Sequence, residues 1–397
     1  MKKTLRDLDL VRKRILIRVD FNVPIVDGDV GDDTRIRASL PTIRYALEQG
    51  ALVVIASHLG RPKGQHRPKL TLAPVASRLS TLLDRPVRFA PDCVGDPALE
   101  AVAAAGFGDV VLLENLRFHP GEEANDPTFS RQLASLADCY VNDAFGAAHR
   151  AHASTVGVVA FLEAAAAGLL MSEELQHLGA LLGEPERPFV AILGGSKVSG
   201  KLEVLENLLE RVDTLLVGGA MTYTFFKARG YPTGGSLVEA DLVDATLRIE
   251  KVARDRGVRL ELPTDHVVAD RLEAGAEFET VDVTDPAIGG RMGLDIGPRT
   301  SAAYADVIAR GRTVVWNGPM GVFEIDEFAH GTLVVANAVA SSGATTVIGG
   351  GDSIAAVNKA GVADRITHVS TGGGASLEFL GGRTLPGVAA LPDLTVN

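Results

Sequence analysis

The chain has 397 residues, of which 46% are hydrophobic and 22% are charged, an ordinary composition for a globular protein with large cores. This length exceeds what one core usually supports, so we expect about two domains. The formal net charge of −11 argues against nucleic acid or an anionic membrane as a partner. Any bound anion therefore needs a local basic cluster.

Cysteine usage and the N-terminus favour an intracellular setting. Cys93 and Cys139 are too few for a disulfide scaffold in a chain of this length, so we expect buried, reduced thiols. Acidic residues from Asp7 onward follow the first lysines, and no apolar signal segment is present. The most apolar stretch outside the expected strands, residues 161–171, is too short to cross a bilayer and carries Glu163. These features predict a cytoplasmic protein.

Short apolar runs alternate with amphipathic segments along the whole chain. The runs are nearly continuous in apolar residues, as in parallel strands that are covered on both faces. Helical periodicity marks the intervening segments, for example 72–83 and 202–212. This alternation predicts an α/β fold with parallel sheets. The expected strands are Ile15–Val19, Leu52–Ala56, Val110–Leu113, Cys139–Val141, Val190–Leu193, Thr214–Val217, Val314–Trp316 and Thr345–Ile348.

A linking helix is expected in the middle of the chain. A helical pattern opens at residues 164–168 and places Leu175, Leu178 and Leu182 on one face. The glycine and prolines of Gly183–Pro188 then end it. We expect a second domain to start after this helix with its own strand.

Four glycine-rich turns follow β-like runs in the second half. Glycine lets the backbone approach a ligand closely, and the N-terminus of a following helix offers unpaired N–H groups to an anion. Ligands of open parallel sheets bind at the carboxyl ends of the strands. Because Lys197, Lys201 and Asp352 stand on or beside these turns, we expect them to hold the phosphates of a nucleotide. The turns are Gly194–Lys197, Gly218–Ala220, Gly349–Ser353 and Gly372–Ser376.

The segment Gly195–Leu202 reads GSKVSGKL, which is a P-loop pattern at every position except the last. A P-loop needs Ser or Thr there to bind Mg²⁺, and Leu202 has no oxygen in its side chain. The segment is therefore either a degenerate P-loop or a different phosphate-binding turn. Asp352 could supply the carboxylate for Mg²⁺ instead. The ordinary role of such an aspartate is to cap a helix N-terminus, which is compatible with metal binding.

Arginine-bearing segments recur at strand ends in the first half. Arginine suits carboxylate and phosphate recognition through paired N–H donors. A single arginine is more often a surface residue, but repetition in an acidic chain favours an anionic substrate. His149 and His152 lack a third residue at metal-ligand spacing, so substrate contact or structure is favoured for them. The segments are Arg18–Pro24, Asp32–Arg37, Ser57–Pro62, Glu114–Phe118 and Ala148–His152.

Taken together, these segments resemble those of phosphoglycerate kinases, in the family's order over essentially the whole chain. The first half contributes RVDFNVP at 18–24, DDTRI at 32–36, SHLGRP at 57–62, LLENLRFH at 112–119 and DAFGAAHRAH at 143–152. The second half contributes KVSGK at 197–201, GLDIGP at 293–298, WNGPMGVFE at 316–324, GGGDS at 349–353 and STGGGASLEFL at 370–380.

The resemblance implies two Rossmann-like, three-layer domains with parallel sheets, joined by a hinge helix, with the C-terminal tail returning to the first domain. It implies a phosphoglycerate-binding domain at 1–168 with the tail 381–397, and a nucleotide-binding domain at 169–380 that includes the linking helix. The implied reaction is reversible, Mg²⁺-dependent phosphoryl transfer from 1,3-bisphosphoglycerate to ADP, which gives 3-phosphoglycerate and ATP in glycolysis. A monomer with small-molecule partners is implied as well.

The resemblance also implies residue roles. Arg35 and Lys197 are the implied catalytic residues, because they would stabilise the moving phosphoryl group. Glu324 would contact the ribose, and Asp352 would bind Mg²⁺. The implied phosphoglycerate ligands are Asp20, Phe21, Asn22, Arg35, His58, Leu59, Gly60, Arg61, Arg117 and Arg150. The implied nucleotide ligands are Lys201, Gly293, Asn317, Pro319, Glu324, Gly350, Gly351, Asp352 and Ser353.

Five positions depart from the family pattern. Gly200 replaces the usual Asp, which creates the P-loop appearance, and Ser196 and Ala220 replace Ala and Gly in their turns. Arg291 replaces Trp, and Gly381 replaces Glu. These changes bear on nucleotide affinity and the hinge more than on the reaction.

Three functions other than that of a phosphoglycerate kinase fit the sequence less well. A P-loop-like ATPase would hydrolyse ATP without an acceptor, and Leu202 argues against it. A non-catalytic nucleotide-binding protein could lose its phosphate-handling residues freely, yet Arg35, Lys197, Lys201 and Asp352 are all present. A dinucleotide dehydrogenase is disfavoured, because no strand carries G-x-G-x-x-G followed by an acidic residue about 20 positions on.

Overall fold

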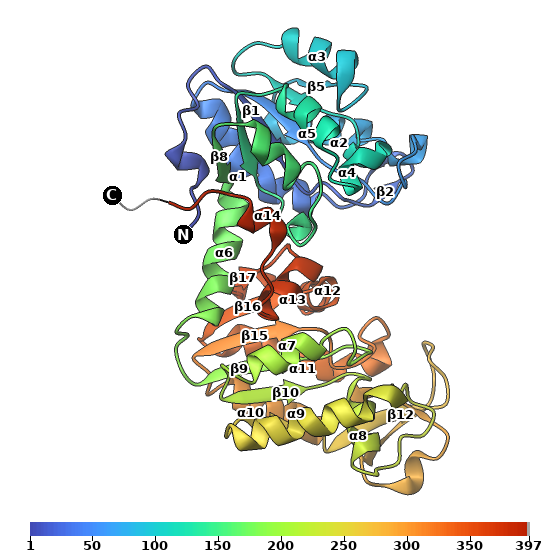
Figure 1. Cartoon of the computed structure of the whole chain (residues 1–397). Coiled ribbons are helices and arrows are strands. Elements are labelled where there is room, and N and C mark those ends of the chain that lie inside the picture. The colour runs from blue at the N-terminus through green and yellow to red at the C-terminus, as the bar shows by residue number, and fades with distance from the viewer. Residues whose placement is uncertain (395–397) are drawn as a thin grey trace. The chain divides into compact units, whose positions relative to one another are not determined.

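The computed structural model of the protein describes residues 1–394, so residues 395–397 of the expected tail lie outside the described part. The chain forms two compact units (Figure 1). The first contains residues 1–176 and the C-terminal segment from Thr384, and the second contains residues 177–383. None of the helices in residues 1–394 combines the length and the hydropathy that a membrane span requires.

The first unit consists of a six-stranded parallel sheet and the helices that pack against it. Its strands lie in the order β5-β6-β4-β1-β7-β8. They are β1 (Arg14–Arg18), β4 (Leu52–Ala56), β5 (Val87–Phe89), β6 (Val110–Leu112), β7 (Cys139–Asn142) and β8 (Ala165–Ala167), and a small hairpin pairs β2 (Ile25–Val26) with β3 (Asp29–Val30). The helices are α1 (Thr34–Glu48), α2 (Ala73–Leu83), α3 (Gly95–Ala103), α4 (Pro120–Glu123), α5 (Pro127–Ala134) and α14 (Pro386–Ala389).

The core of this unit explains why its strands read as apolar runs. Ile15 and Ile17 of β1 and Val53 of β4 are fully buried in one cluster with Ile36 and Ile43 of α1. A strand covered by helices on both faces has no polar face to alternate with the apolar one. The carboxyl ends of β1 and β4 lie side by side, because Arg18 pairs with Ala56 in parallel register.

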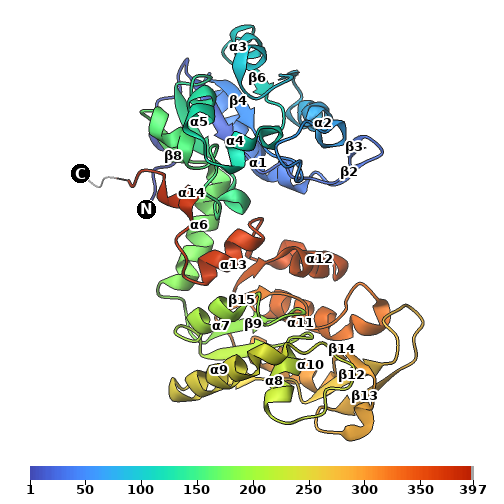
Figure 2. The ribbon, with the colours of Figure 1, turned by 45° about the vertical axis from the view of Figure 1, so that its right-hand side comes forward.

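The second unit contains a six-stranded parallel sheet and a three-stranded antiparallel one. The parallel order is β11-β10-β9-β15-β16-β17, and the antiparallel order is β13-β12-β14. The parallel strands are β9 (Phe189–Leu193), β10 (Thr214–Val217), β11 (Arg259–Glu261), β15 (Thr313–Asn317), β16 (Thr345–Gly349) and β17 (His368–Val369). The antiparallel strands, grouped at one end of the unit in Figure 2, are β12 (Asp265–Ala269), β13 (Phe278–Asp282) and β14 (Met292–Ile296). The helices are α7 (Leu202–Leu208), α8 (Thr222–Ala228), α9 (Val243–Asp255), α10 (Pro298–Ile308), α11 (His330–Ser341), α12 (Gly351–Lys359) and α13 (Gly374–Leu380).

The helix α6 (Leu169–Leu182) links the two units, as expected from the sequence. The C-terminal segment returns to the first unit, which is also confirmed. The N–H of Lys3 donates to the carbonyl of Pro392 at 3.0 Å, and the N–H of Gly387 donates to the carbonyl of Ala148 at 2.8 Å. The N-terminus consequently lies on the same unit as the described end of the chain, where the N–H of Leu394 donates to the carbonyl of Met1 at 2.7 Å.

All eight expected strands are present, with bounds within one residue of those expected. One expectation about the linker is wrong, because Ala165–Ala167 does not open the helix. These alanines form the edge strand β8, in which Ala165 pairs with Tyr140 of β7. The helical pattern at 202–212 is also shorter than expected, since α7 ends at Leu208.

Candidate active site

Polar groups meet at the carboxyl ends of β1 and β4 in the first unit. The Oδ2 atom of Asp20 accepts a hydrogen bond of 2.8 Å from Nη1 of Arg35, and Oδ1 of Asn22 accepts one of 2.9 Å from the N–H of Gly60. The segments that follow two paired parallel strands leave the sheet at the same edge. The structure therefore brings together these four residues that the sequence analysis assigned to one substrate.

His58 lies at the centre of an arginine cluster. Its Nδ1 lies 3.0 Å from Nη2 of Arg18, and since a guanidinium only donates, Nδ1 accepts and the neutral ring carries its proton on Nε2. Burial lowers the pKa of His58 well below its usual value, and the positive charges of Arg18, Arg117, Arg35 and Arg150 lower it further. Four cations around one neutral imidazole concentrate positive charge at a point suited to an anion.

Arg18 was not assigned to the site by sequence reasoning. It is fully buried at the end of β1, and its Nε donates to Oγ of Ser154 at 2.8 Å. The Ser154 hydroxyl in turn donates to Oε1 of Glu122 at 2.6 Å. Burial raises the pKa of this buried carboxyl, while the charge of Arg18 opposes the rise. An arginine within an otherwise apolar strand is the signal that could have identified it.

Arg117 is held against the loop that follows β4. Its side chain is 4% exposed, and its Nη1 donates to the carbonyl of Gly60 at 2.8 Å. Burial lowers its pKa to about 10, and neighbouring arginine charges add to this shift. The Nδ2 of Asn115 donates to the carbonyl of Leu59 at 2.7 Å, which fixes the same loop. Gly60 has φ +63°, and a Cβ there would lie 2.8 Å from the side chain of Leu70.

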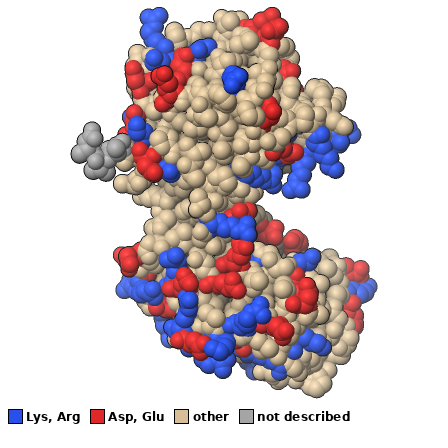
Figure 3. Space-filling view, in the orientation of Figure 1, with Lys and Arg blue, Asp and Glu red and all other residues tan. Residues whose placement is uncertain are grey.

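Not every predicted substrate ligand points its side chain toward this cluster. Phe21 and Leu59 belong to the hydrophobic core, so only their main chains can face a ligand. Arg61 is exposed on its loop. Arg150, whose charge acts on His58, also donates from Nε to Nε2 of His149 at 3.1 Å. Figure 3 shows Lys and Arg side chains gathered on the first unit near β2, whereas both signs of charge are mixed over the second unit.

Two adjoining cavities lie within the second unit. The first has a volume of about 270 Å³ and the second about 350 Å³. Gly195, Ser196, Pro319 and Asp352 line both, so the cavities share a wall. The first is also lined by Ala220, Tyr223, Phe226, His266, Gly293, Asp295 and Glu324. The second is also lined by Lys197, Gly200, Lys201, Asn317, Gly350, Gly351 and Ser353.

Lys201 is anchored at the second cavity. Its Nζ donates to the main-chain oxygen of Asn317 at 2.9 Å and makes a further short contact with the Oδ1 of the same residue. The Nδ2 of Asn317 donates to the carbonyl of Gly349 at 2.8 Å, which joins β15 to β16. Burial lowers the pKa of Lys201 to about 8, and the negative charge of Asp352 opposes this. The side chain is therefore positively charged at neutral pH, and it loses this charge as the pH rises through about 8.

Glycine is required in these turns, because other segments of the main chain approach them closely. A Cβ on Gly194 would lie 2.0 Å from the carbonyl oxygen of Pro319. Gly350 has φ +94° at the start of α12, a conformation that other residues rarely adopt. The hydroxyl of Ser353 accepts a hydrogen bond of 2.6 Å from the N–H of Gly318, so this predicted ligand is already engaged with the main chain.

The first cavity contains polar groups that sequence reasoning missed. The Tyr223 hydroxyl lies 2.6 Å from Nδ1 of His266, and a Cβ on Gly293 would lie 1.4 Å from that hydroxyl. Burial lowers the pKa of His266 to about 4 and raises that of Asp295 to about 7. Asp295 accepts a hydrogen bond of 2.7 Å from the N–H of Gly331. These contacts join residues far apart in the chain, so no local pattern signals them.

Two of the five residues that depart from the family pattern, Arg291 and Gly381, make structural contacts. Nη1 of Arg291 donates to Oε2 of Glu279 at 2.7 Å, and its Nε donates to the carbonyl of Ile288 at 3.3 Å. Arg291 therefore ties the loop before β14 to β13. Gly381 is the C-cap of α13, where its N–H donates to the carbonyl of Leu377 at 2.8 Å.

Comparison with known proteins decides the family. The sequence model described as phosphoglycerate kinase matches residues 5–383. The chain belongs to the phosphoglycerate kinase family. It is 57% identical over 396 residues to the phosphoglycerate kinase of Chlorobium phaeovibrioides, covering 99% of this chain and 100% of that one. It is 58% identical over 392 residues to that of Moorella thermoacetica, covering 99% of each.

Solved structures of the family have the same fold. The phosphoglycerate kinase from Coxiella burnetii matches with a TM-score of 0.89 at 43% identity, and the one from Pyrococcus horikoshii OT3 matches with 0.86 at 37% identity. Both matches cover 98% of each chain. The two-domain α/β fold and the phosphotransferase activity expected from the sequence are thus confirmed. The activity is the glycolytic transfer between 1,3-bisphosphoglycerate and ADP that gives 3-phosphoglycerate and ATP, and the ATPase and non-catalytic alternatives are not favoured.

Proposed function

We propose that the arginine cluster of the first unit binds phosphoglycerate and that the two adjoining cavities of the second unit bind ADP or ATP. One observation carries the phosphoglycerate assignment: Nη2 of Arg18 lies 3.0 Å from Nδ1 of the buried His58, and the charges of three further arginines act on the same imidazole. A compact anion with a carboxylate and a phosphate matches such a cluster. The phosphoglycerate domain would then be 1–168 with the tail from 381, and the nucleotide domain 169–380.

The nucleotide assignment rests on the shared wall of the cavities. The cavity that contains Lys201 and the N-terminus of α12 suits phosphates, because it combines a cation with unpaired N–H groups. The cavity that contains Tyr223 and Phe226 suits a base, with Glu324 placed for the ribose hydroxyls. The remaining proposed nucleotide ligands are Gly293, Asn317, Pro319, Gly350, Gly351, Asp352 and Ser353.

Arg35 and Lys197 are proposed to stabilise the phosphoryl group in transit. The acceptor in the ATP-consuming direction is a carboxylate, which is ionised at neutral pH, so no general base is needed. Transfer then depends on in-line positioning and on neutralising the charge of the equatorial oxygens. Arg35 is held by Asp20, and Lys197 is exposed where it lines the second cavity.

Mg²⁺ is proposed as the cofactor, with Asp352 as its carboxylate ligand. Within residues 1–394 the structure gives this carboxylate neither a hydrogen bond nor a salt bridge, and it lines both cavities, so it fits such an ion. Mg²⁺ prefers one or two carboxylates together with phosphate oxygens, whose charge it neutralises when bound.

The Asp352→Asn variant tests this assignment. We expect the Mg²⁺ concentration needed for half-maximal transfer to rise at least about tenfold, the effect that loss of even an outer-sphere partner has on metal affinity. The matched control is Asp364→Asn, which removes an exposed aspartate after the same helix. An unchanged Mg²⁺ requirement in Asp352→Asn would show that another group holds the ion.

Closure of the two domains about the α6 hinge is also proposed, since each would hold one substrate and transfer requires the two in line. Small-angle scattering should show a smaller radius of gyration with both ligands bound than with neither. An unchanged radius would contradict closure.

A cytoplasmic monomer is proposed as well.

A further inference from the structure

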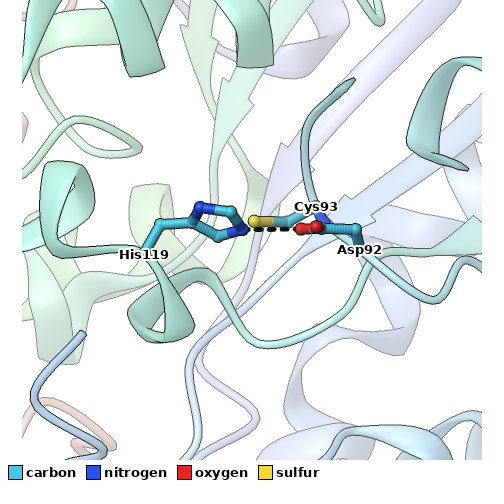
Figure 4. A group of neighbouring side chains, drawn as sticks. All are labelled: Asp92, Cys93 and His119. Atoms are coloured by element: carbon cyan, nitrogen blue, oxygen red, sulfur yellow. Dashed lines mark hydrogen bonds and ion pairs between the residues drawn. The ribbon is translucent and has the colours of Figure 1, made fainter. Parts of the chain in front are cut away.

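Three side chains with metal-binding atoms lie together in the first unit, outside the arginine cluster (Figure 4). Asp92 and Cys93 stand between β5 and α3, and His119 stands directly before α4. Because β5 and β6 pair in parallel, the segments that follow them leave the same edge of the sheet. One carboxylate oxygen, the thiol sulfur and one imidazole nitrogen all lie within 4.8 Å of one another.

One of the three groups is buried and the other two are partly exposed. Cys93 is fully buried, whereas the side chains of Asp92 and His119 keep 37% and 33% of their exposure. Nε2 of His119 lies 2.7 Å from Oδ1 of Asp92, and the N–H of Cys93 donates to the same oxygen at 2.6 Å. The ring of His119 also packs against Phe129, with centroids 5.4 Å apart. An ion could enter past the two exposed side chains and meet the sulfur beneath them.

We propose that Asp92, Cys93 and His119 bind a zinc ion, or another divalent ion that prefers sulfur and nitrogen, with water as the fourth ligand. Thiolate, imidazole and carboxylate are the groups that Zn²⁺ takes, at roughly 2.0–2.3 Å, and a tetrahedron of that size sets them roughly 3.3–3.8 Å apart. The 2.7 Å between His119 and Asp92 must open, and any separation near 4.8 Å must close, by about 1 Å or less in the two partly exposed side chains. A sulfur ligand disfavours Mg²⁺, so this site is chemically distinct from the one proposed at Asp352.

Binding exchanges a proton for the metal. The Sγ–H bond of Cys93 breaks, the sulfur keeps the electron pair and donates it to the ion, and the proton passes to the buffer. Nε2 of His119, which donates to Asp92, gives up its proton as the neutral ring takes one from solvent on Nδ1, so the Nε2 lone pair and the Asp92 carboxylate each bind the ion in place of their hydrogen bond. No oxidation or reduction takes place, so the site needs no further reactant.

Cobalt(II) is the probe, because a Co²⁺–thiolate bond gives a charge-transfer absorption in the near ultraviolet. We expect the metal-free full chain to bind one Co²⁺ with this band, and Zn²⁺ but not excess Mg²⁺ to abolish it. Cys93→Ala should lose the band, while Cys139→Ala, the matched variant at the other buried cysteine, should keep it. His119→Ala and Asp92→Asn alter partly exposed side chains, and each should weaken Co²⁺ binding at least about tenfold.

The same titration can overturn the proposal. Absence of the thiolate band in the wild-type chain would leave Asp92, Cys93 and His119 as an ion pair beside a packed thiol. A band that persists in Cys93→Ala would place the metal elsewhere. Because Cys93 is fully buried, circular dichroism should accompany its variant, and the His119 and Asp92 variants decide the matter if that chain fails to fold.

Discussion

Arg35 and Asp20 are joined by a hydrogen bond of 2.8 Å between Nη1 and Oδ2 at the edge of the first sheet. The Arg35 side chain nevertheless keeps 37% of its exposure, while that of Asp20 keeps 15%. The carboxylate therefore orients the guanidinium, whose other N–H donors make no hydrogen bond within residues 1–394. This arrangement suits a residue that acts on a group arriving from solution, as proposed for the transferred phosphoryl.

The Arg35→Ala variant should lower kcat by about a hundredfold or more, the effect of removing one transition-state donor, with little loss of nucleotide affinity. Arg37→Ala is the matched control, because Arg37 lies on the same helix, is more exposed and pairs with Asp33. Steady-state kinetics and isothermal titration with ADP would measure the two effects. A kcat equal to that of the wild type would remove Arg35 from the reaction.

Lys201 should make nucleotide use depend on pH. Its pKa is lowered to about 8 by burial, so the ammonium group that is proposed to bind the phosphates is lost as pH rises through 8. The kcat/KM for ATP should therefore fall between pH 7 and 9. In Lys201→Arg the cation persists, and the fall should disappear even if the absolute value drops. The same fall in both proteins would assign the titration to another group.

Asp143 should make the free energy of unfolding depend on pH. The residue is buried after β7, accepts a hydrogen bond of 3.2 Å from the N–H of Met171 at the start of α6, and has its pKa raised to about 7 by burial. In the unfolded chain the value is 3.8, so between pH 3.8 and 7 the native state binds more protons. Stability contributed by the protonated group is thus lost as pH rises through this window, by at most about 1.4 kcal/mol per pH unit.

Urea unfolding of the wild type and Asp143→Asn at pH 5, 6, 7 and 8 measures this contribution. The free energy of the variant minus that of the wild type should grow up to about pH 7 and then stay level, because the amide does not titrate. Asp295, whose pKa is raised to about 7 as well, is present in both proteins and cancels. A difference that is constant from pH 5 to 7 would contradict the shift at Asp143.

Eight of the twelve parallel strands could be predicted, because burial on both faces leaves an uninterrupted apolar run. The antiparallel sheet was not predicted, since most of β13 is exposed and its sequence FETVD reads as polar. The alanines of β8 were assigned to a helix because alanine is the strongest helix former. Their pairing with β7 is a tertiary contact that outweighs this local preference.

The residues of the candidate site likewise fall into those that the local sequence indicates and those that depend on distant partners. Residues in turns and at strand ends, such as Arg35, Lys201 and Asp352, stand out in the sequence because their neighbours are glycines or motif residues. Tyr223 did not, because its contact with His266 joins residues 43 positions apart in the chain. Arg18 lies in one of the expected arginine segments, but its contact with Ser154, 136 residues away, could not be predicted. Such pairs are set by sheet register and helix placement, which no local spacing reports.

The proposed division of labour is tested most directly by a coupled assay of ATP-dependent phosphorylation of 3-phosphoglycerate. ADP should form only when 3-phosphoglycerate and Mg²⁺ are both present, and Lys197→Ala should lower kcat by about a hundredfold. Lys251→Ala, which removes an exposed lysine paired with Asp255, should leave kcat unchanged. ADP formation that is independent of 3-phosphoglycerate, or a Lys197→Ala variant with wild-type kcat, would contradict the account.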